Sequence, residues 1–272
     1  MKKKVNYYRQ HNANLLAEVP AEAFNGWGKK EIEIPIKETA FLIMHSWNYG
    51  ISPKLEYGPN TRFKGLWNVV EYVPRAIEIT KRVVGPLLEK VRSSKLTIIH
   101  VGSSENYCKN YPGYQKAKAL SGDPSPILEG AVKKNWSKIK TVERCGEENL
   151  QNIQNAQKYV DFPNITRPRG NEWVVINSHQ LNALCRRLKI WNLIYTGFAI
   201  NWCLFESPAG MIDMSRLGYG CSTIKEAVTA VENDWTAREE LCKKLALWKI
   251  AMSYGYVINL EDFLKALEGE TK

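Results

Sequence analysis

Short apolar runs alternate with amphipathic stretches along most of the chain after residue 36. Continuous apolar runs of strand length occupy residues 39–44, 96–101, 172–176 and 193–197. Such runs are typical of strands that are buried on both faces. Between them, apolar residues recur at three- and four-residue spacing over 74–93 and 180–188, which predicts helices. Strands that alternate with helices pair in parallel. The pattern predicts an α/β fold: a three-layer, Rossmann-like parallel sheet with helices on both faces, in a single domain.

Three further elements complete the predicted order. We expect a helix over residues 203–217, a short strand over 218–223 and covering helices within 241–267. Gly85-Pro86 lies inside the first predicted helix, and because proline has no N–H to donate, we expect a kink or a break there.

Two segments lie outside this regular pattern. Residues 1–35 contain Asn, Pro and Gly residues that interrupt any period, so we predict an N-terminal extension packed on a main domain of residues 36–268. Residues 102–169 form a long, weakly patterned excursion. Excursions of this length are usually functional or partly helical, and in α/β folds they often lie over the carboxyl ends of the strands.

Composition narrows the class of protein. The chain of 272 residues carries a net charge of +10, but its Lys and Arg residues are scattered and no recognition-helix or zinc-finger pattern accompanies them. We therefore expect no nucleic-acid partner. The basic N-terminus is followed by no apolar signal region, and no apolar run is long enough to cross a bilayer, so we expect a cytoplasmic protein without membrane contact. Six widely spaced cysteines indicate reduced thiols rather than a disulfide framework.

One of the six cysteines lies at a position where it could act as a nucleophile. Cys203 follows a predicted buried strand and begins a predicted helix. A thiol in the first turn of a helix is exposed to the positive end of the helix dipole, which lowers the thiol pKa, and free N–H groups there can bind an oxyanion. The structural alternative is that Cys203 packs as a small apolar residue.

Four segments in register resemble the isochorismatase-like cysteine hydrolase family. Gly197 stands six residues before Cys203-Leu204, and Glu226-Ala227 resembles the later Asp-Ala pair of that family. Upstream, 39–48 resembles the first strand of the family, and 85–100 resembles its first helix and second strand. The resemblance covers about residues 36–268.

The resemblance implies a catalytic set that this chain carries in altered form. It makes Cys203 the nucleophile and places the oxyanion hole at the backbone amides of Ala199 and Cys203. A cis peptide bond would fall at Phe198-Ala199. The Asp that serves as base in the family is replaced by His45, which can itself activate a thiol as a thiolate–imidazolium pair. The family Lys is replaced by Asn177, which can donate a hydrogen bond but supplies no charge. Without the resemblance, His45 is interpreted as a polar residue at a strand end.

The resemblance and the strand order also predict which residues line the substrate pocket and whether a metal is bound. We expect Trp47, Asn48, His100 and Trp202 to line the substrate pocket. No Asp-x-His follows Asn48, as it does in family members that hold a metal, so we predict neither metal nor cofactor.

Two functions remain open. The first is a cysteine-dependent hydrolase of a C–N bond in a small amide-like substrate, with His45 in place of the usual Asp. The second is a catalytically degenerate relative that serves as a binding or oligomeric scaffold, because both the Asp and the Lys are missing. The resemblance also implies a homo-oligomer.

Overall fold

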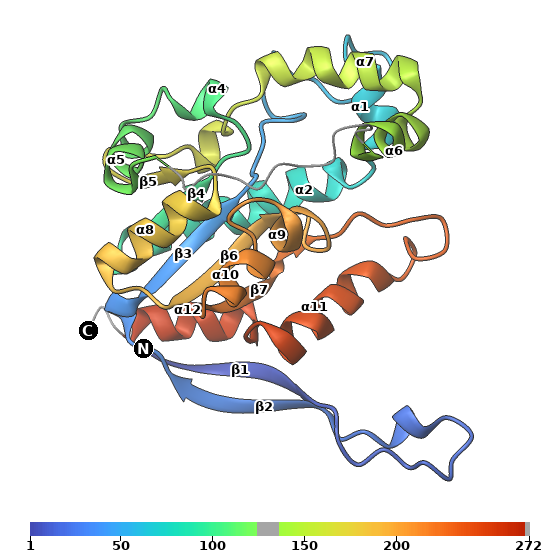
Figure 1. Ribbon diagram of the computed structural model, residues 1–272, viewed down its shortest axis with the longest axis vertical. Helices are drawn as coiled ribbons and strands as arrows, with labels where there is room; N and C mark the ends of the chain where they lie inside the picture. Colours follow the sequence, from blue (N-terminus) through green and yellow to red (C-terminus); the bar gives the residue numbers. More distant parts are fainter. Residues whose placement is uncertain (124–135, 270–272) are drawn as a thin grey trace.

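A single twisted sheet forms the centre of the protein. The computed structural model describes residues 1–123 and 136–269. In these residues eight strands run in the order β2-β1-β8-β7-β6-β3-β4-β5 (Figure 1). The strands are β1 (Lys2–Arg9), β2 (Gly26–Glu33), β3 (Thr39–Met44), β4 (Thr97–Val101), β5 (Trp173–Val175), β6 (Asn192–Phe198), β7 (Gly220–Thr229) and β8 (Val257–Ile258). Strands β3 to β8 pair in parallel, whereas β1 pairs antiparallel with both β2 and β8. The predicted α/β class with a mostly parallel sheet is confirmed.

Helices connect the strands and cover the sheet. The α-helices are α1 (Lys64–Val69), α2 (Val73–Ile79), α3 (Gly85–Arg92), α4 (Glu105–Cys108), α5 (Pro112–Ser121), α6 (Trp136–Cys145), α7 (Glu147–Ala156), α8 (Ser178–Leu188), α9 (Cys203–Glu206), α10 (Met211–Arg216), α11 (Leu241–Ser253) and α12 (Leu260–Glu268). Short 3-10 helices are η1 (Pro20–Ala23), η2 (Ile36–Glu38), η4 (Gln157–Tyr159) and η5 (Asn164–Thr166), and η3 (Thr80–Val84) is a π-helical turn.

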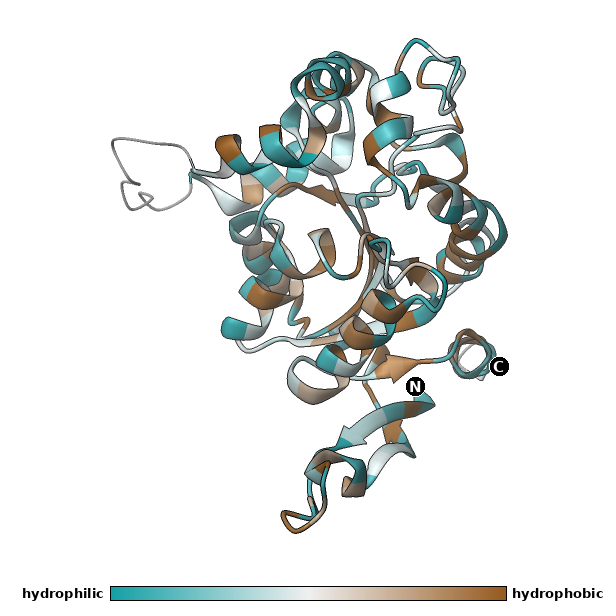
Figure 2. Cartoon of the chain, turned by 90° about the vertical axis from the view of Figure 1, so that its right-hand side faces the viewer, coloured by the Kyte–Doolittle hydropathy of each residue, from teal (hydrophilic) through white to brown (hydrophobic). Residues whose placement is uncertain are grey.

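Side chains of the central strand β3 alternate between two hydrophobic cores. Leu42 and Met44 face the core that α8, α10 and α11 complete, and Phe41 and Ile43 face the core that α3 and α12 complete. All six residues of β3 are buried. A strand covered on both faces is continuously apolar, which is why its sequence shows no alternation. Figure 2 shows the hydrophobic strands enclosed by helices with hydrophilic outer sides.

The predicted helix over 74–93 is divided near Gly85-Pro86. The π-helical turn η3 joins α2 to α3, and Pro86 lies in the first turn of α3. Proline cannot donate a hydrogen bond to the preceding turn, so the wider turn before it follows from the sequence.

The prediction of one continuous helix over 203–217 is wrong. This segment is split into α9 and α10, because Pro208 and the left-handed residue Ala209 (φ 68°) lie between them. The strand predicted over 218–223 is longer than expected, since β7 continues to Thr229.

The described part of the irregular excursion over 102–169 contains four short α-helices, α4 to α7, and the 3-10 helices η4 and η5, whose patterns were too weak to predict individually. Its segment 124–135 lies outside the described residues.

Residues 2–33 form a hairpin that the sequence pattern did not predict. Strands β1 and β2 pair from Lys2↔Glu33 to Arg9↔Gly26. Strand β1 meets β8 at Asn6↔Val257, and the far end of the hairpin projects beyond the body of the protein (Figure 1).

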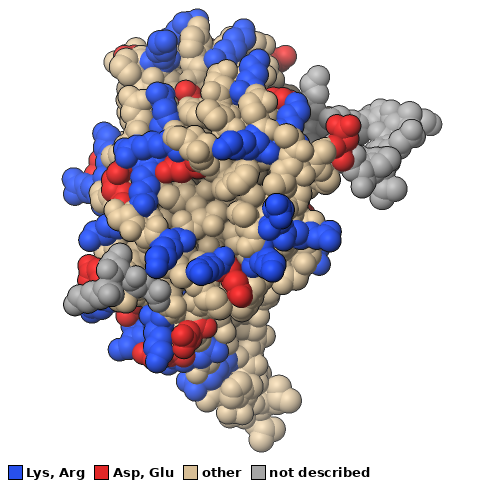
Figure 3. Space-filling model, turned by 90° about the vertical axis from the view of Figure 1, so that its left-hand side faces the viewer, with Lys and Arg blue, Asp and Glu red and all other residues tan. Residues whose placement is uncertain are grey.

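Charged side chains are mixed over the surface. Figure 3 shows Lys and Arg distributed over one whole face with Asp and Glu between them. Several are paired, for example Lys118 with Glu105 at 2.7 Å and Arg169 with Glu89 at 2.8 Å. Over residues 1–123 and 136–269, no helix has the length and apolar character needed to cross a membrane.

Candidate active site

The carboxyl ends of β3 and β6 bring two predicted site segments together. Met44, the last residue of β3, pairs with Gly197 of β6, so the next residues, His45 and Phe198, lie beside each other. Gly197 has φ 110°, and a Cβ built on it would lie 1.9 Å from the Met44 carbonyl oxygen. The glycine of the Gly197-to-Cys203 spacing is therefore required for two strands to approach this closely.

The loop from Phe198 to Cys203 is held by backbone hydrogen bonds. The Phe198-Ala199 peptide bond is cis, so that prediction is confirmed. The Ala199 carbonyl accepts hydrogen bonds from the N–H groups of Trp202 (3.2 Å) and Leu204 (3.0 Å), and the Ile200 N–H donates to the Thr229 carbonyl (2.9 Å). These bonds place Cys203 as the first residue of α9.

Three donors lie near the half-buried thiol of Cys203 and act on its pKa. They are the Ser207 hydroxyl, the backbone N–H of Ala199 and the N–H of Cys203 itself. Each lowers the pKa of the thiol, but burial acts more strongly in the opposite direction, and the net pKa is raised. The lowered pKa expected from a helix start is therefore wrong. The physical reason is burial, which removes solvation from the charged thiolate more than the nearby donors stabilise it.

His45 is a buried, neutral imidazole. Its side chain stacks on Trp47 with ring centroids 5.1 Å apart, and its Nδ1 has no hydrogen-bond partner in the described part of the chain. Burial lowers its pKa to about 4, although a hydrogen bond with the Gly102 backbone acts in the opposite direction. A thiolate–imidazolium pair is thus not the resting state, since both groups are uncharged at neutral pH.

Tyr49 and Tyr72 lie near both His45 and Cys203. A small cavity is lined by His45, Tyr49, Tyr72 and Phe198 among others, and Cys203 does not line it. Burial raises the pKa of both tyrosines, and the nearby Cys203 raises it further. Sequence reasoning missed Tyr72 and Ser207. The i, i+4 spacing of Ser207 from Cys203 was the available signal.

Asn177 begins α8. Its Oδ1 accepts a hydrogen bond from the Gln180 N–H at 2.9 Å, which is the N-cap interaction. The next residue, Ser178, donates to Asp213 at 2.6 Å and accepts from the Ala209 N–H at 2.7 Å. Asn177 does not line the cavity that contains His45.

The four predicted pocket residues separate into different environments. Trp47 lines the His45 cavity and donates to Ser103 Oγ at 3.1 Å. Asn48 binds the backbone of residues 159–161. Trp202 is 40% exposed, and the Arg144 guanidinium of α6 stacks over its ring at 4.5 Å.

His100 belongs to a buried ion-pair cluster instead. Its Nε2 lies 2.8 Å from Glu172, which also binds Arg92 at 2.7 Å. Burial opposes the charge of Glu172, but hydrogen bonds from Arg92 and His100 outweigh it and lower the pKa of Glu172 to about 2. Because Ile43 and His100 are paired across neighbouring strands, this cluster lies on the face opposite Met44.

No group of three or more His, Cys, Asp or Glu side chains in residues 1–123 and 136–269 is arranged to hold a metal ion. The expectation of no metal stays a prediction.

Solved structures share this architecture. A cysteine hydrolase from Pseudomonas syringae pv. phaseolicola 1448A superposes with a TM-score of 0.53 and 12% sequence identity, over 87% of this chain and 95% of that chain. An isochorismatase family protein from Burkholderia thailandensis gives 0.47 and 16%, over 85% and 96%. An isochorismatase-like hydrolase from Alkaliphilus metalliredigens gives 0.48 and 14%, over 85% and 99%. No family model and no curated protein matches the sequence. The chain therefore has the fold of the cysteine hydrolase from Pseudomonas syringae.

Proposed function

We propose that the protein is a cysteine-dependent hydrolase that cleaves a C–N bond in a small amide-like substrate. The observation that carries this proposal is the position of Cys203 at the start of α9, after the cis Phe198-Ala199 bond, with the Ala199 N–H, its own N–H and the Ser207 hydroxyl near Sγ. A nucleophile surrounded by fixed donors has the geometry needed to stabilise the negative charge that develops during acyl transfer.

The reaction proceeds through a thioester. Cys203 Sγ attacks the amide carbon as its proton passes to His45, and the carbonyl oxygen becomes an oxyanion held by the N–H groups of Ala199 and Cys203. The C–N bond then breaks, and the proton on His45 passes to the leaving nitrogen. Water, deprotonated by His45, hydrolyses the thioester and restores the Cys203 thiol.

A neutral His45 suits this role. An imidazole with a pKa of about 4 is uncharged at neutral pH and can accept a proton, and once protonated it is a strong enough acid to protonate a poor leaving group. Asn177 enters the proposal through its Nδ2, which can donate to a bound carbonyl while Oδ1 caps α8.

The remaining parts of the proposal concern the whole chain. We assign the hydrolase domain to residues 36–268 and treat residues 1–35 as an extension. We expect a cytoplasmic homo-oligomer that needs no cofactor, no metal and no nucleic-acid partner.

The second candidate is a scaffold without catalysis. It is favoured by the raised pKa of Cys203, by the neutral state of His45 and by the engagement of Asn177 as a helix cap. In a protein that only binds, these three side chains need no common function.

Hydrolysis of a panel of small amides and imides tests the proposal. We expect Cys203→Ala and His45→Gln to lower kcat/KM at least about a thousandfold, and the thioester on Cys203 to be detectable by mass spectrometry. Cys242→Ser is the matched control, because Cys242 is the other half-exposed cysteine and lies outside the site.

Hydrolysis that survives Cys203→Ala would contradict the cysteine mechanism. Absence of both hydrolysis and acylation across the panel, with the wild type fully folded, would favour the scaffold.

A further inference from the structure

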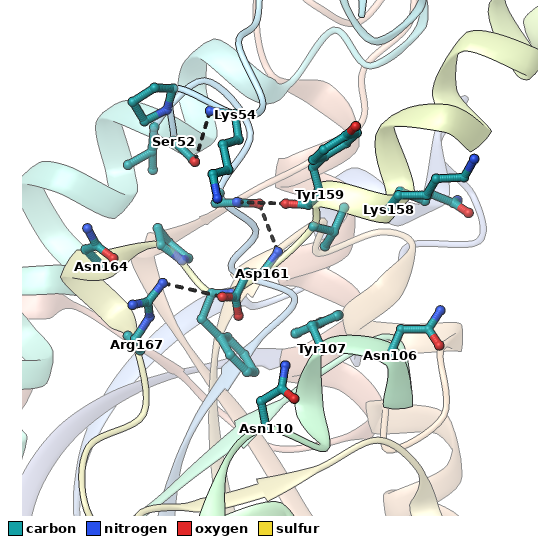
Figure 4. Close-up of a pocket in the computed structure, with 17 residues that line it drawn as sticks. Ser52, Lys54, Asn106, Tyr107, Asn110, Lys158, Tyr159, Asp161, Asn164 and Arg167 are labelled. Carbon is teal, nitrogen blue, oxygen red and sulfur yellow. Dashed lines mark hydrogen bonds and ion pairs between the residues drawn. The ribbon is translucent and has the colours of Figure 1, made fainter.

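A polar cavity of about 470 Å³ lies beside the small cavity that contains His45. Figure 4 shows the residues that line it. Three segments far apart in the sequence form its walls: residues 48–54 after β3, residues 106–110 in and after α4, and the chain from Gln157 to Arg167. Cys203, Ala199 and Ser207 do not line it. Ile51 lines both this cavity and the small cavity that contains His45. The two spaces are therefore neighbours without being the same site.

Asn48 holds the floor of this cavity in place. Its backbone N–H donates to the Asp161 carbonyl (3.1 Å), its Nδ2 donates to the Tyr159 carbonyl (3.1 Å), and its Oδ1 accepts from the Asp161 N–H (3.0 Å). Asn48 is buried, so these bonds are protected from water. The cavity is thus preformed and needs little ordering when a ligand binds.

Positive charge on the cavity wall exceeds negative charge. The wall carries Lys54, Lys158 and Arg167 against one carboxylate, Asp161. That carboxylate already accepts hydrogen bonds from the Tyr111 hydroxyl (2.7 Å) and the Phe162 N–H (2.8 Å), and it pairs with Arg167 at 3.4 Å.

The two lysines are the uncompensated charges. Neither the Lys54 nor the Lys158 ammonium has an ion-pair or hydrogen-bond partner among residues 1–123 and 136–269. An anion that contacts either lysine would gain a charge-assisted contact without breaking an existing pair.

Amide groups supply the other contacts. The side chains of Asn106, Asn110 and Asn164 line the same cavity and make no hydrogen bond in the described residues (Figure 4). Most small-molecule pockets are largely apolar. This one presents amides, each with a donor and an acceptor, which match hydroxyl groups on a ligand.

We propose that this cavity binds a small hydroxylated anion, in which a phosphate or carboxylate contacts Lys54 or Lys158 and the hydroxyl groups contact the asparagine amides. The site is separate from Cys203 and does not depend on the proposed hydrolysis.

Isothermal titration calorimetry with three probes tests the proposal. Ribose 5-phosphate carries a phosphate, D-gluconate carries a carboxylate, and ribose carries hydroxyl groups without charge. We expect at least one of the two anions to bind, uncharged ribose to bind at least about tenfold more weakly, and the anion affinity to fall as salt is added. Which anion binds identifies the head group.

Substitution of the two lysines locates the site. In the double variant Lys54→Gln with Lys158→Gln we expect the anion affinity to fall at least about tenfold. The matched control is Lys81→Gln with Lys95→Gln, which removes the same charge from exposed lysines that do not line the cavity. The control should bind like the wild type, and so should Cys203→Ser.

Three results would overturn the proposal: neither anion binds, ribose binds as well as the anions, or the two double variants lose affinity equally. All five substituted positions are exposed or half-buried, and a thermal melt of each variant verifies that it is folded.

Discussion

At the scale of single residues, the two central groups of the site are both held neutral by burial. The thiol of Cys203 and the imidazole of His45 each lose solvation of their charged form, which raises the pKa of the acid and lowers that of the base. In the proposed reaction, charge therefore develops as Cys203 attacks and not before. In that proposal the N–H groups of Ala199 and Cys203 matter most at this step, because they would meet the developing negative charge.

Gly197 allows the strand ends to meet, and its replacement tests that role. In Gly197→Ala the new Cβ would lie 1.9 Å from the Met44 carbonyl oxygen on a backbone with φ 110°. We expect the free energy of unfolding to fall by about 2 to 5 kcal/mol, measured by urea denaturation.

Gly170→Ala is the control for this prediction. Gly170 also has positive φ (53°), but no atom lies within 4 Å of a Cβ built there, so only backbone strain of about 1 kcal/mol is expected. Equal losses in the two variants would show that the close approach to Met44 is unimportant.

At the scale of elements, the first turns of α8 and α9 differ in the groups that their N–H donors bind. Helix α8 runs for eleven residues and its first turn is capped by the Asn177 side chain. Helix α9 makes one turn, and the N–H groups of Leu204, Phe205 and Glu206 donate to the carbonyls of Ala199 and Trp202, whereas the Cys203 N–H lies near Cys203 Sγ. A side-chain cap stabilises the start of α8, and backbone hydrogen bonds hold Cys203 at the start of α9.

Two substitutions of Asn177 separate its cap from its proposed contact with substrate. Asn177→Ala removes the bond to the Gln180 N–H and should cost about 1 kcal/mol of unfolding free energy. Asn177→Asp keeps that bond but has no N–H to donate, so we expect wild-type stability and a kcat/KM about tenfold lower.

Ser104→Ala is the control, because Ser104 caps α4 in the same way by accepting from the Asn106 N–H. It should lose stability while its kcat/KM stays unchanged. If Asn177→Asp is as active as the wild type, Asn177 is a cap alone.

At the scale of the whole molecule, the N-terminal hairpin is joined to the body through a buried lysine. Lys3 of β1 is 2% exposed, its Nζ has no partner in the described residues, and it lies 6.0 Å from the ring centroid of Phe263 in α12. Burial lowers the pKa of Lys3 from 10.5 to about 7.

This burial predicts how stability depends on pH. Between pH 7 and 10.5 the unfolded chain keeps the Lys3 proton and the folded protein has lost it, so raising the pH favours folding. We expect the contribution of Lys3 to unfolding free energy to rise over this range by at most about 5 kcal/mol, and to be flat below pH 7 where both states are protonated.

The measurement is urea denaturation at several pH values between 6 and 10. Lys3→Met should remove the rise and be more stable than the wild type at pH 7, because a chain of similar length then packs without a charge. Lys2→Met, at the exposed neighbouring position, should keep the wild-type pH dependence. A Lys3→Met profile parallel to that of the wild type would show that Lys3 keeps an ordinary pKa.

The sequence by itself determined the central strands of the sheet and the place of the cysteine, but not β1, β2 and β8. Strands such as β3 and β6 are buried on both faces, so their residues are apolar without interruption, and the pattern of 39–44 and 193–197 could be interpreted directly. Gly197 and Cys203 are close in sequence, which is why their spacing already predicted the loop between a strand and a helix start.

Only the tertiary structure decided what depends on contacts between distant segments. The pKa values of His45 and Cys203 follow from burial by residues elsewhere in the chain, and the Asn177 side chain could be assigned to its cap only from its geometry. The cavity beside Asn48 joins three separate segments, and the excursion that supplies two of them has no clear period. Local pattern predicts what each residue does within its own element, whereas burial, charge balance and cavities are properties of the assembled fold.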